Sequence, residues 1–156
     1  MRGLIVIHNT FVLERVYLKS AGNVFAAFSV PDKKRRWYAN GRGHDILSYD
    51  LDFRIGGNEV LVGQMKSGTP VAGAVLKWSQ TFADIIKDER IVFTQTVDFD
   101  ERRISCALIS IALNPDAAGC SMTFTHQGVY FDGADGSELR ENGWRGLLDG
   151  IEHALE

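Results

Sequence analysis

The sequence predicts an α+β fold in which one long C-terminal helix lies across a curved antiparallel sheet. Segments with apolar side chains at every second position fill most of the chain up to Tyr130, and short turns separate them. From Ser137 onward the apolar period changes to about three and a half residues, as in an amphipathic helix. Two short segments with helical spacing follow the first expected strand. We therefore expect about six or seven strands, two short helices and a closing helix.

The first expected strand spans residues 10–19 and is rich in Val, Leu and Tyr. A short helix should begin at Ser20 or Ala21, because the next apolar residues have helical spacing. A second short helix should begin at Pro31, whose missing N–H costs nothing in a first turn, and should end near Trp37. This second helix would carry the basic residues 33–36, which we interpret as a solvated turn rather than an anion or membrane site.

The middle of the chain is expected to form consecutive antiparallel strands joined by tight turns. The alternation is clearest in residues 46–55, where Leu47, Tyr49 and Leu51 share a face that continues to Ile55. Gly56 and Gly57 then mark a tight turn or bulge. The expected strands are residues 46–55, 59–65, 74–86, 90–99, 103–113 and 119–130.

The closing helix is predicted by one apolar stripe, formed by Trp144, Leu147, Leu148, Ile151 and Leu155. Ser137 and Arg140, three positions apart, form an incomplete capping box. Glu138 and Glu141 complement the positive end of the helix dipole. A helix of this kind needs a sheet beneath it, which the preceding strands supply.

Composition favours one soluble domain over residues 1–156. The 156 residues include 45% hydrophobic and 24% charged residues, with a net charge of −3. A mildly acidic chain of this kind is not expected to bind nucleic acid, which requires a basic face. The apolar run at residues 4–7 is too short for a signal peptide or a membrane span, so we expect a cytoplasmic protein without a membrane partner.

Motifs for metal, cofactor or covalent chemistry are not expected in this chain. Cys106 and Cys120 fit small buried side chains in a reducing compartment, and the four histidines show no metal-ligand spacing. No G-x-S-x-G sequence is present, and no glycine-rich loop precedes a phosphate-binding helix. We therefore expect no cofactor and no metal, and a non-enzymatic role is favoured over catalysis.

Several short motifs resemble a known family. They are D-F-R-I-G-G at residues 52–57, F-A-D-I at 82–85 with R-I-V-F-T at 90–94, A-G-C at 118–120, Q-G at 127–128, and N-G-W at 142–144. In order and spacing they resemble the START-like, helix-grip domains of the SRPBCC superfamily, within the group related to the activator of the ninety-kilodalton heat-shock protein ATPase. The chain departs from the pattern where residues 118–120 replace Gly-Gly-Thr and where Lys87 replaces proline. The resemblance implies a START-like ligand-binding domain with a cavity between sheet and helix.

The candidate ligand-binding side chains are those expected to face this cavity: Trp37, Phe53, Arg54, Trp78, Phe93, Met122, Phe124, Gln127, Trp144 and Leu148. The aromatic members could instead fill a solid core, which the sequence does not distinguish from a cavity. Asp52 and Arg54 share one face and form either a polar contact in the cavity or a surface ion pair. Of His126 and Gln127 only one can face inward, and the resemblance favours Gln127.

Two functions of different kinds follow as alternatives. The first is a binding module for a small hydrophobic or amphipathic molecule. The second is a co-chaperone-like domain that binds a chaperone or another protein. A cyclase or hydrolase in the same cavity is less favoured, since Asp52, Arg54 and Gln127 are its only candidate polar residues. Exposed edge strands also leave a homodimer open.

Overall fold

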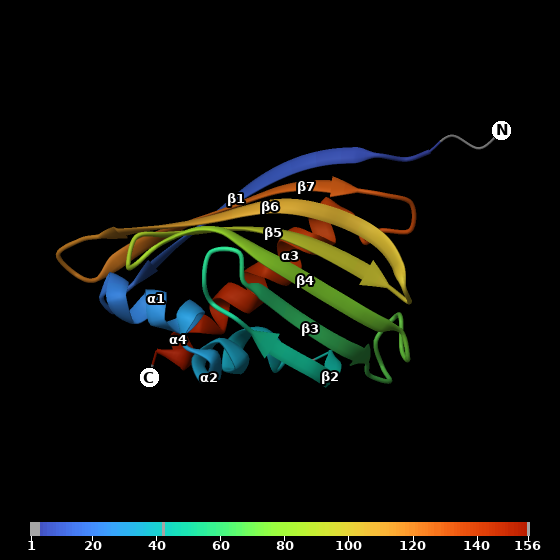
Figure 1. The fold of residues 1–156 in the computed structure, drawn as a ribbon, viewed down its shortest axis with the longest axis horizontal. Coiled ribbons are helices and arrows are strands. Elements are labelled where there is room, and N and C mark those ends of the chain that lie inside the picture. The colour runs from blue at the N-terminus through green and yellow to red at the C-terminus, as the bar shows by residue number, and fades with distance from the viewer. Residues whose placement is uncertain (1–3, 42, 156) are drawn as a thin grey trace.

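The structure, a computed structural model, describes residues 4–41 and 43–155. The strands form one antiparallel sheet in the order β1-β7-β6-β5-β4-β3-β2. Their bounds are β1 Ile7–Tyr17, β2 His44–Leu51, β3 Asn58–Met65, β4 Val75–Ile86, β5 Arg90–Phe99, β6 Arg102–Pro115 and β7 Cys120–Tyr130. Figure 1 shows the sheet curving around the C-terminal helices, which lie on its concave side. The predicted α+β fold with a helix against a curved sheet is confirmed.

The first helices follow β1 as predicted. They are α1 Ala21–Ser29, α2 Pro31–Lys34 and a π-helical turn, η1, Arg35–Ala39. Ser20 caps α1 by accepting a hydrogen bond from the backbone N–H of Asn23 at 3.2 Å. Pro31 occupies the first turn of α2. The helical segment continues past Trp37, because η1 adds a turn that ends at Ala39.

The C-terminal helix is divided in two, α3 Ser137–Asp149 and α4 Ile151–Ala154, with Gly150 between them. The expected capping box does not form. Gly136, at φ 90°, is the N-cap residue, a conformation that glycine adopts without strain. The Arg140 side chain does not cap the helix; it donates hydrogen bonds to Asp135 in the preceding loop.

The strand expected at residues 46–55 ends earlier, at Leu51. A bulge shifts the β2–β3 register between Ile46 and Ser48, which turns Leu47 outward and leaves it 55% exposed. Beyond Leu51 the chain makes a turn in which Gly57 donates a backbone hydrogen bond to Arg54. The expected inner face is correct at Tyr49 and Leu51 and wrong before the bulge, where Ile46 rather than Leu47 packs against the core.

Strand β1 pairs only with β7, the last strand, so that Ile7 lies opposite Tyr130 and Tyr17 opposite Cys120. The remaining strands form a meander of consecutive antiparallel neighbours from β2 to β7. Strands β1 and β2 are therefore the two edges of the sheet. An edge-to-edge homodimer stays a prediction.

The core lies where α1, α4 and the second half of α3 face the sheet. Its fully buried members include Met122, Phe124, Leu148 and Ile151. Lys34 is also buried, with 3% of its surface exposed, so the interpretation of residues 33–36 as an entirely solvated turn is wrong at this position. Within the described ranges, no helix combines the length and hydropathy required to cross a membrane.

Candidate ligand-binding site

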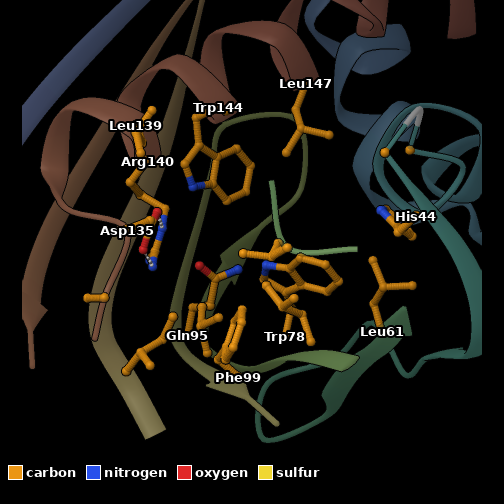
Figure 2. Close-up of a pocket in the computed structure, with 18 of the residues that line it drawn as sticks. His44, Leu61, Trp78, Gln95, Phe99, Asp135, Leu139, Arg140, Trp144 and Leu147 are labelled. Atoms are coloured by element: carbon orange, nitrogen blue, oxygen red, sulfur yellow. Dashed lines mark hydrogen bonds and ion pairs between the residues drawn. The ribbon is translucent and has the colours of Figure 1, made fainter. Parts of the chain in front are cut away.

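A cavity of about 770 Å³ lies between strands β3–β6 and α3. Trp144 and Leu147 of α3 face it from one side, and Trp78, Gln95 and Phe99 face it from the sheet (Figure 2). The η1–β2 loop, the β3–β4 loop and the β7–α3 loop complete the wall. The alternation of the inner strand faces thus supplies one wall, and the helix supplies the other.

The cavity reaches the molecular surface. Leu139 and Val71 both line it, and they are 64% and 38% exposed. Leu139 lies in the first turns of α3, and Val71 lies in the loop between β3 and β4. Because two apolar side chains at the rim are in contact with water, a ligand that enters here would also cover apolar surface at the opening.

Gln95 and Arg140 are the most deeply buried polar side chains of the lining. Gln95, on β5, is 2% exposed, and Arg140, on α3, is 9% exposed. The Arg140 guanidinium donates to both carboxylate oxygens of Asp135, from Nε at 2.9 Å and from Nη2 at 2.7 Å. A mostly apolar wall with a few oriented polar groups is the usual composition of a small-molecule site.

A buried ion pair lies beside the cavity. Lys34 Nζ donates to Glu59 at 2.8 Å, and Tyr49 and Gln80 also donate to the Glu59 carboxylate. The Lys34 ammonium lies 4.6 Å from the ring centroid of Tyr38, and the rings of Phe28 and Trp37 are also near it. The three hydrogen bonds to Glu59 and the aromatic rings around Lys34 offset the desolvation cost of burying both charges.

Tyr38 connects this ion pair to the cavity. Its ring lines the cavity and stacks on Trp144 with centroids 6.2 Å apart. Burial and then the Glu59 charge raise the pKa of Tyr38 well above its ordinary value, whereas the Gln95 amide and Arg140 oppose this shift. The phenol is therefore a neutral group at physiological pH.

A second buried polar group lies behind Arg140. The Arg140 guanidinium sits 5.3 Å from the centroid of the Tyr130 ring, and His126 stacks on Phe11 at 4.6 Å. Burial and then the Arg140 charge lower the pKa of His126 to about 4. His126 is therefore neutral at physiological pH. Burial likewise raises the pKa of Tyr130.

Only part of the predicted site lines the cavity. Trp78 and Trp144 do so. Trp37 packs against Phe28 and donates its indole N–H to the Ala27 carbonyl at 2.8 Å. The remaining apolar candidates belong to the packed core or lie against it: Phe53, Phe93, Met122, Phe124 and Leu148.

The two polar candidates lie outside the cavity. Arg54 and Asp52 form an exposed ion pair at 2.8 Å, with side chains 70% and 53% exposed, so the surface alternative holds. Gln127 is exposed, and His126 is the residue that faces inward, which reverses the expectation. The polar set considered for a cyclase or hydrolase is therefore not gathered at the cavity.

Sequence reasoning missed the residues that give the cavity its polarity: Tyr38, Asp135, Arg140 and Gln95. A signal for Gln95 was present. It is the one polar residue on the inner face of β5, between Phe93 and Val97. Arg140 gave no such signal, because its position in the first turn of a helix is ordinarily exposed.

The comparisons with known proteins now identify the family. A family model described as "Activator of Hsp90 ATPase homolog 1-like protein" matches residues 19–156. The chain belongs to this family. Its structure is similar to those of an uncharacterized protein from Rhizobium leguminosarum, with 32% identity, TM-score 0.88 and coverage of 99% of this chain and 98% of that one. A search of curated proteins finds no significant match.

Two further solved structures are also similar to this chain. A protein from Rhizobium loti is 37% identical, with TM-score 0.84 and coverage of 96% of this chain and 99% of the other. A protein of the same family from Aeromonas hydrophila is 18% identical, with TM-score 0.67 and coverage of 95% and 96%. At that identity the likeness concerns the fold alone. Together with the family match, these structures confirm the resemblance drawn from the sequence motifs.

Proposed function

We propose that the protein binds a hydrophobic or amphipathic small molecule in the cavity between the sheet and α3. The observation that carries this proposal is the cavity itself, which has a volume of about 770 Å³ and a lining of aromatic and aliphatic side chains. This volume lies within the range of roughly 300–1,000 Å³ typical of ligand sites. The opening beside Leu139 and Val71 provides a route for entry.

The test is binding of N-phenyl-1-naphthylamine, a neutral fluorescent probe of apolar sites. Gly143 and Gly146 offer a matched pair of variants on α3. Gly143 lines the cavity, whereas Gly146 lines only a separate groove between α3 and η1, to which Gly143 also contributes. Apart from the adjacent residues and the helix backbone, no described atom lies within 4 Å of the position of a Cβ on either glycine.

We expect the probe to bind the unmodified protein and to raise its melting temperature. Gly143→Leu should weaken binding at least tenfold, because the new side chain occupies part of the cavity. Gly146→Leu should leave binding unchanged, although it alters helix propensity to the same degree. Failure of the unmodified protein to bind this probe or a broad set of apolar compounds would overturn the proposal. Equal loss in both variants would place the binding outside the cavity.

A second candidate function is interaction with a chaperone, which the family description favours. The surface available for it is the outer face of β1, where Val12 and Val16 are 51% and 68% exposed, next to Leu18 at 82%. This function predicts that the protein stimulates the ATPase of a ninety-kilodalton heat-shock protein and that Val16→Asp abolishes the effect. An unchanged ATPase rate would remove this candidate without affecting the first.

A further inference from the structure

The polar groups of the cavity carry information about the ligand beyond its apolar character. Apart from His44 and the Tyr38 hydroxyl, they occupy two places, Gln95 on the sheet side and the Arg140–Asp135 pair at the start of α3 (Figure 2). In each place a hydrogen-bond network within the protein fixes which atom remains for a ligand. The donor or acceptor character of these atoms can therefore be derived.

The orientation of the Gln95 amide follows from Glu59. A carboxylate only accepts hydrogen bonds, so Gln80 must direct its amide nitrogen toward Glu59. The Gln80 oxygen then faces Gln95 and accepts from Gln95 Nε2 at 3.4 Å. Reversal of either amide would place two oxygens or two nitrogens against each other. Gln95 is thereby held with its carbonyl oxygen as the atom left to accept a hydrogen bond.

The guanidinium of Arg140 leaves no donor within reach of a ligand. Its Nε and Nη2 atoms are engaged by Asp135, whereas Nη1 is buried without a hydrogen-bond partner among the described residues. Because Nη1 has essentially no accessible surface, a molecule in the cavity does not contact it. The charge of Arg140 is already matched by Asp135, and that of Lys34 by Glu59. Neither of these two buried cations therefore calls for a counter-charge on the ligand.

We propose, on the basis of the binding function above, that the natural ligand is an uncharged, largely apolar molecule that carries at least one hydroxyl group. The hydroxyl hydrogen is donated to Gln95 Oε1 or to Asp135. A carboxylate would bring an unmatched negative charge beside Asp135 and Glu59. An ammonium group would meet no free anion, since both carboxylates are already paired.

The experiment is displacement of N-phenyl-1-naphthylamine by three compounds of one skeleton: 2-methylnaphthalene, 2-naphthol and 2-naphthoate. We expect 2-naphthol to displace the probe at a concentration at least about fivefold lower than 2-methylnaphthalene, which is the scale of one net hydrogen bond. We expect 2-naphthoate to be at least about tenfold weaker than 2-naphthol.

Variants of the cavity show which residue accepts the hydrogen bond from 2-naphthol. Gln95→Met keeps the length of the side chain and removes the acceptor, so the advantage of 2-naphthol over 2-methylnaphthalene should shrink at least threefold. Gln127→Met is the matched control, because Gln127 is exposed on the outer face, and it should preserve the advantage. Retention of the advantage in Gln95→Met would assign the hydroxyl to Asp135. The double variant Asp135→Asn with Arg140→Met would then be required to abolish it.

The outcomes separate this inference from the binding function. If the probe does not bind, the binding function itself fails. If the probe binds but 2-naphthoate matches or exceeds 2-naphthol, the inference is overturned and the binding function stands. The same holds if 2-methylnaphthalene matches 2-naphthol. Because these comparisons use the unmodified protein, they remain decisive even if Gln95→Met does not fold.

Discussion

The space between the sheet and the C-terminal helices is packed at one end and hollow at the other. At the packed end, α1 and α4 close over the sheet, and Phe124, Leu148 and Ile151 have essentially no exposed surface. At the hollow end α3, Tyr38 of η1 and three loops cover the sheet, and the helix presents Gly143 there. Strands β4 to β6 contribute side chains to both ends, so the covering helices and the size of their side chains decide which end is filled.

The boundary between the two ends is the Lys34–Glu59 ion pair. Lys34 lies over Phe28 and Trp37 of the packed end and over Tyr38, which lines the cavity. Its position holds η1 against the sheet and thereby fixes the Tyr38 wall. Disruption of this pair should affect both ends together, whereas other changes should affect one end only.

The largest expected effect is therefore that of Lys34→Met. It leaves the Glu59 carboxylate, with 0% exposure, without its counter-charge, and should lower the free energy of unfolding by about 3–5 kcal/mol. Urea unfolding followed by circular dichroism measures the loss. The double variant Lys34→Met with Glu59→Gln should recover part of it, because no buried charge remains. A loss below about 1 kcal/mol in the single variant would contradict the boundary role.

Adjacent leucines on α3 test the comparison directly. Leu148 is fully buried at the packed end, and Leu147 lines the cavity. Leu148→Ala should cost about 3 kcal/mol through lost contacts and a new void, and Leu147→Ala only about 1 kcal/mol. Both substitutions change helix propensity equally, so the difference in chemical denaturation reports packing alone. Equal losses would mean that the hollow end is as tightly packed as the other.

His126 gives the hollow end a dependence on pH. Its folded-state pKa of about 4 lies below the ordinary value of 6.5, because burial, chiefly, and then the Arg140 charge disfavour the protonated ring, whereas a backbone hydrogen bond and Asp135 oppose the shift. The unfolded state then binds more protons between these values, so the stabilisation is present above about pH 6.5 and is lost as pH falls toward 4.

Between pH 7 and pH 5 this loss should be about 2 kcal/mol. The measurement is the free energy of unfolding at both pH values for the unmodified protein and for His126→Gln, in which this part of the loss should disappear. His153→Gln, at an exposed position, is the matched control and should retain it. An unchanged pH dependence in His126→Gln would show that carboxylates account for all of it.

The smallest expected effect concerns the glycines. Gly143→Ala should stabilise the protein by about 0.5–1 kcal/mol, because alanine favours the helix and meets open space. Gly128→Ala should instead destabilise it, since a Cβ there would lie 2.8 Å from the Tyr130 ring and 2.9 Å from the His126 ring. Thermal unfolding distinguishes the two signs. Stabilisation in both variants would show that the wall near Gly128 has room to adjust.

The sequence predicted the elements better than it predicted the site. Alternation of side chains located β4 to β7, and the change of period located α3, because both patterns reflect burial against a single sheet face. The same patterns placed Phe124 and Trp144 inward alike. An inward side chain can pack in the core or line the cavity, depending on which side chains of the helix lie opposite it. Alternation within one strand contains no information about that helix.

The polar part of the site was less accessible still. Arg140 is buried because the loop before α3 places Asp135 beside it, which depends on the backbone of Gly136 rather than on the pattern of the helix. The motif resemblance predicts the wrong faces for Gln127 and His126, because it conflicts here with strand alternation. Phe124 and Met122 share the face of His126, so alternation alone would have predicted it correctly.

The pairing of the first strand with the last has a consequence for synthesis on the ribosome. Tyr17 lies opposite Cys120, so β1 must wait for roughly 100 further residues before its partner exists. At about 5–20 residues per second, that delay is on the order of 5–20 s. During this time the meander from β2 to β6 can already pair with itself, while the apolar inner side of β1, with Phe11 and Leu13, has no strand beside it. In the nascent chain, β1 thus stays without a paired strand until the sheet is nearly complete.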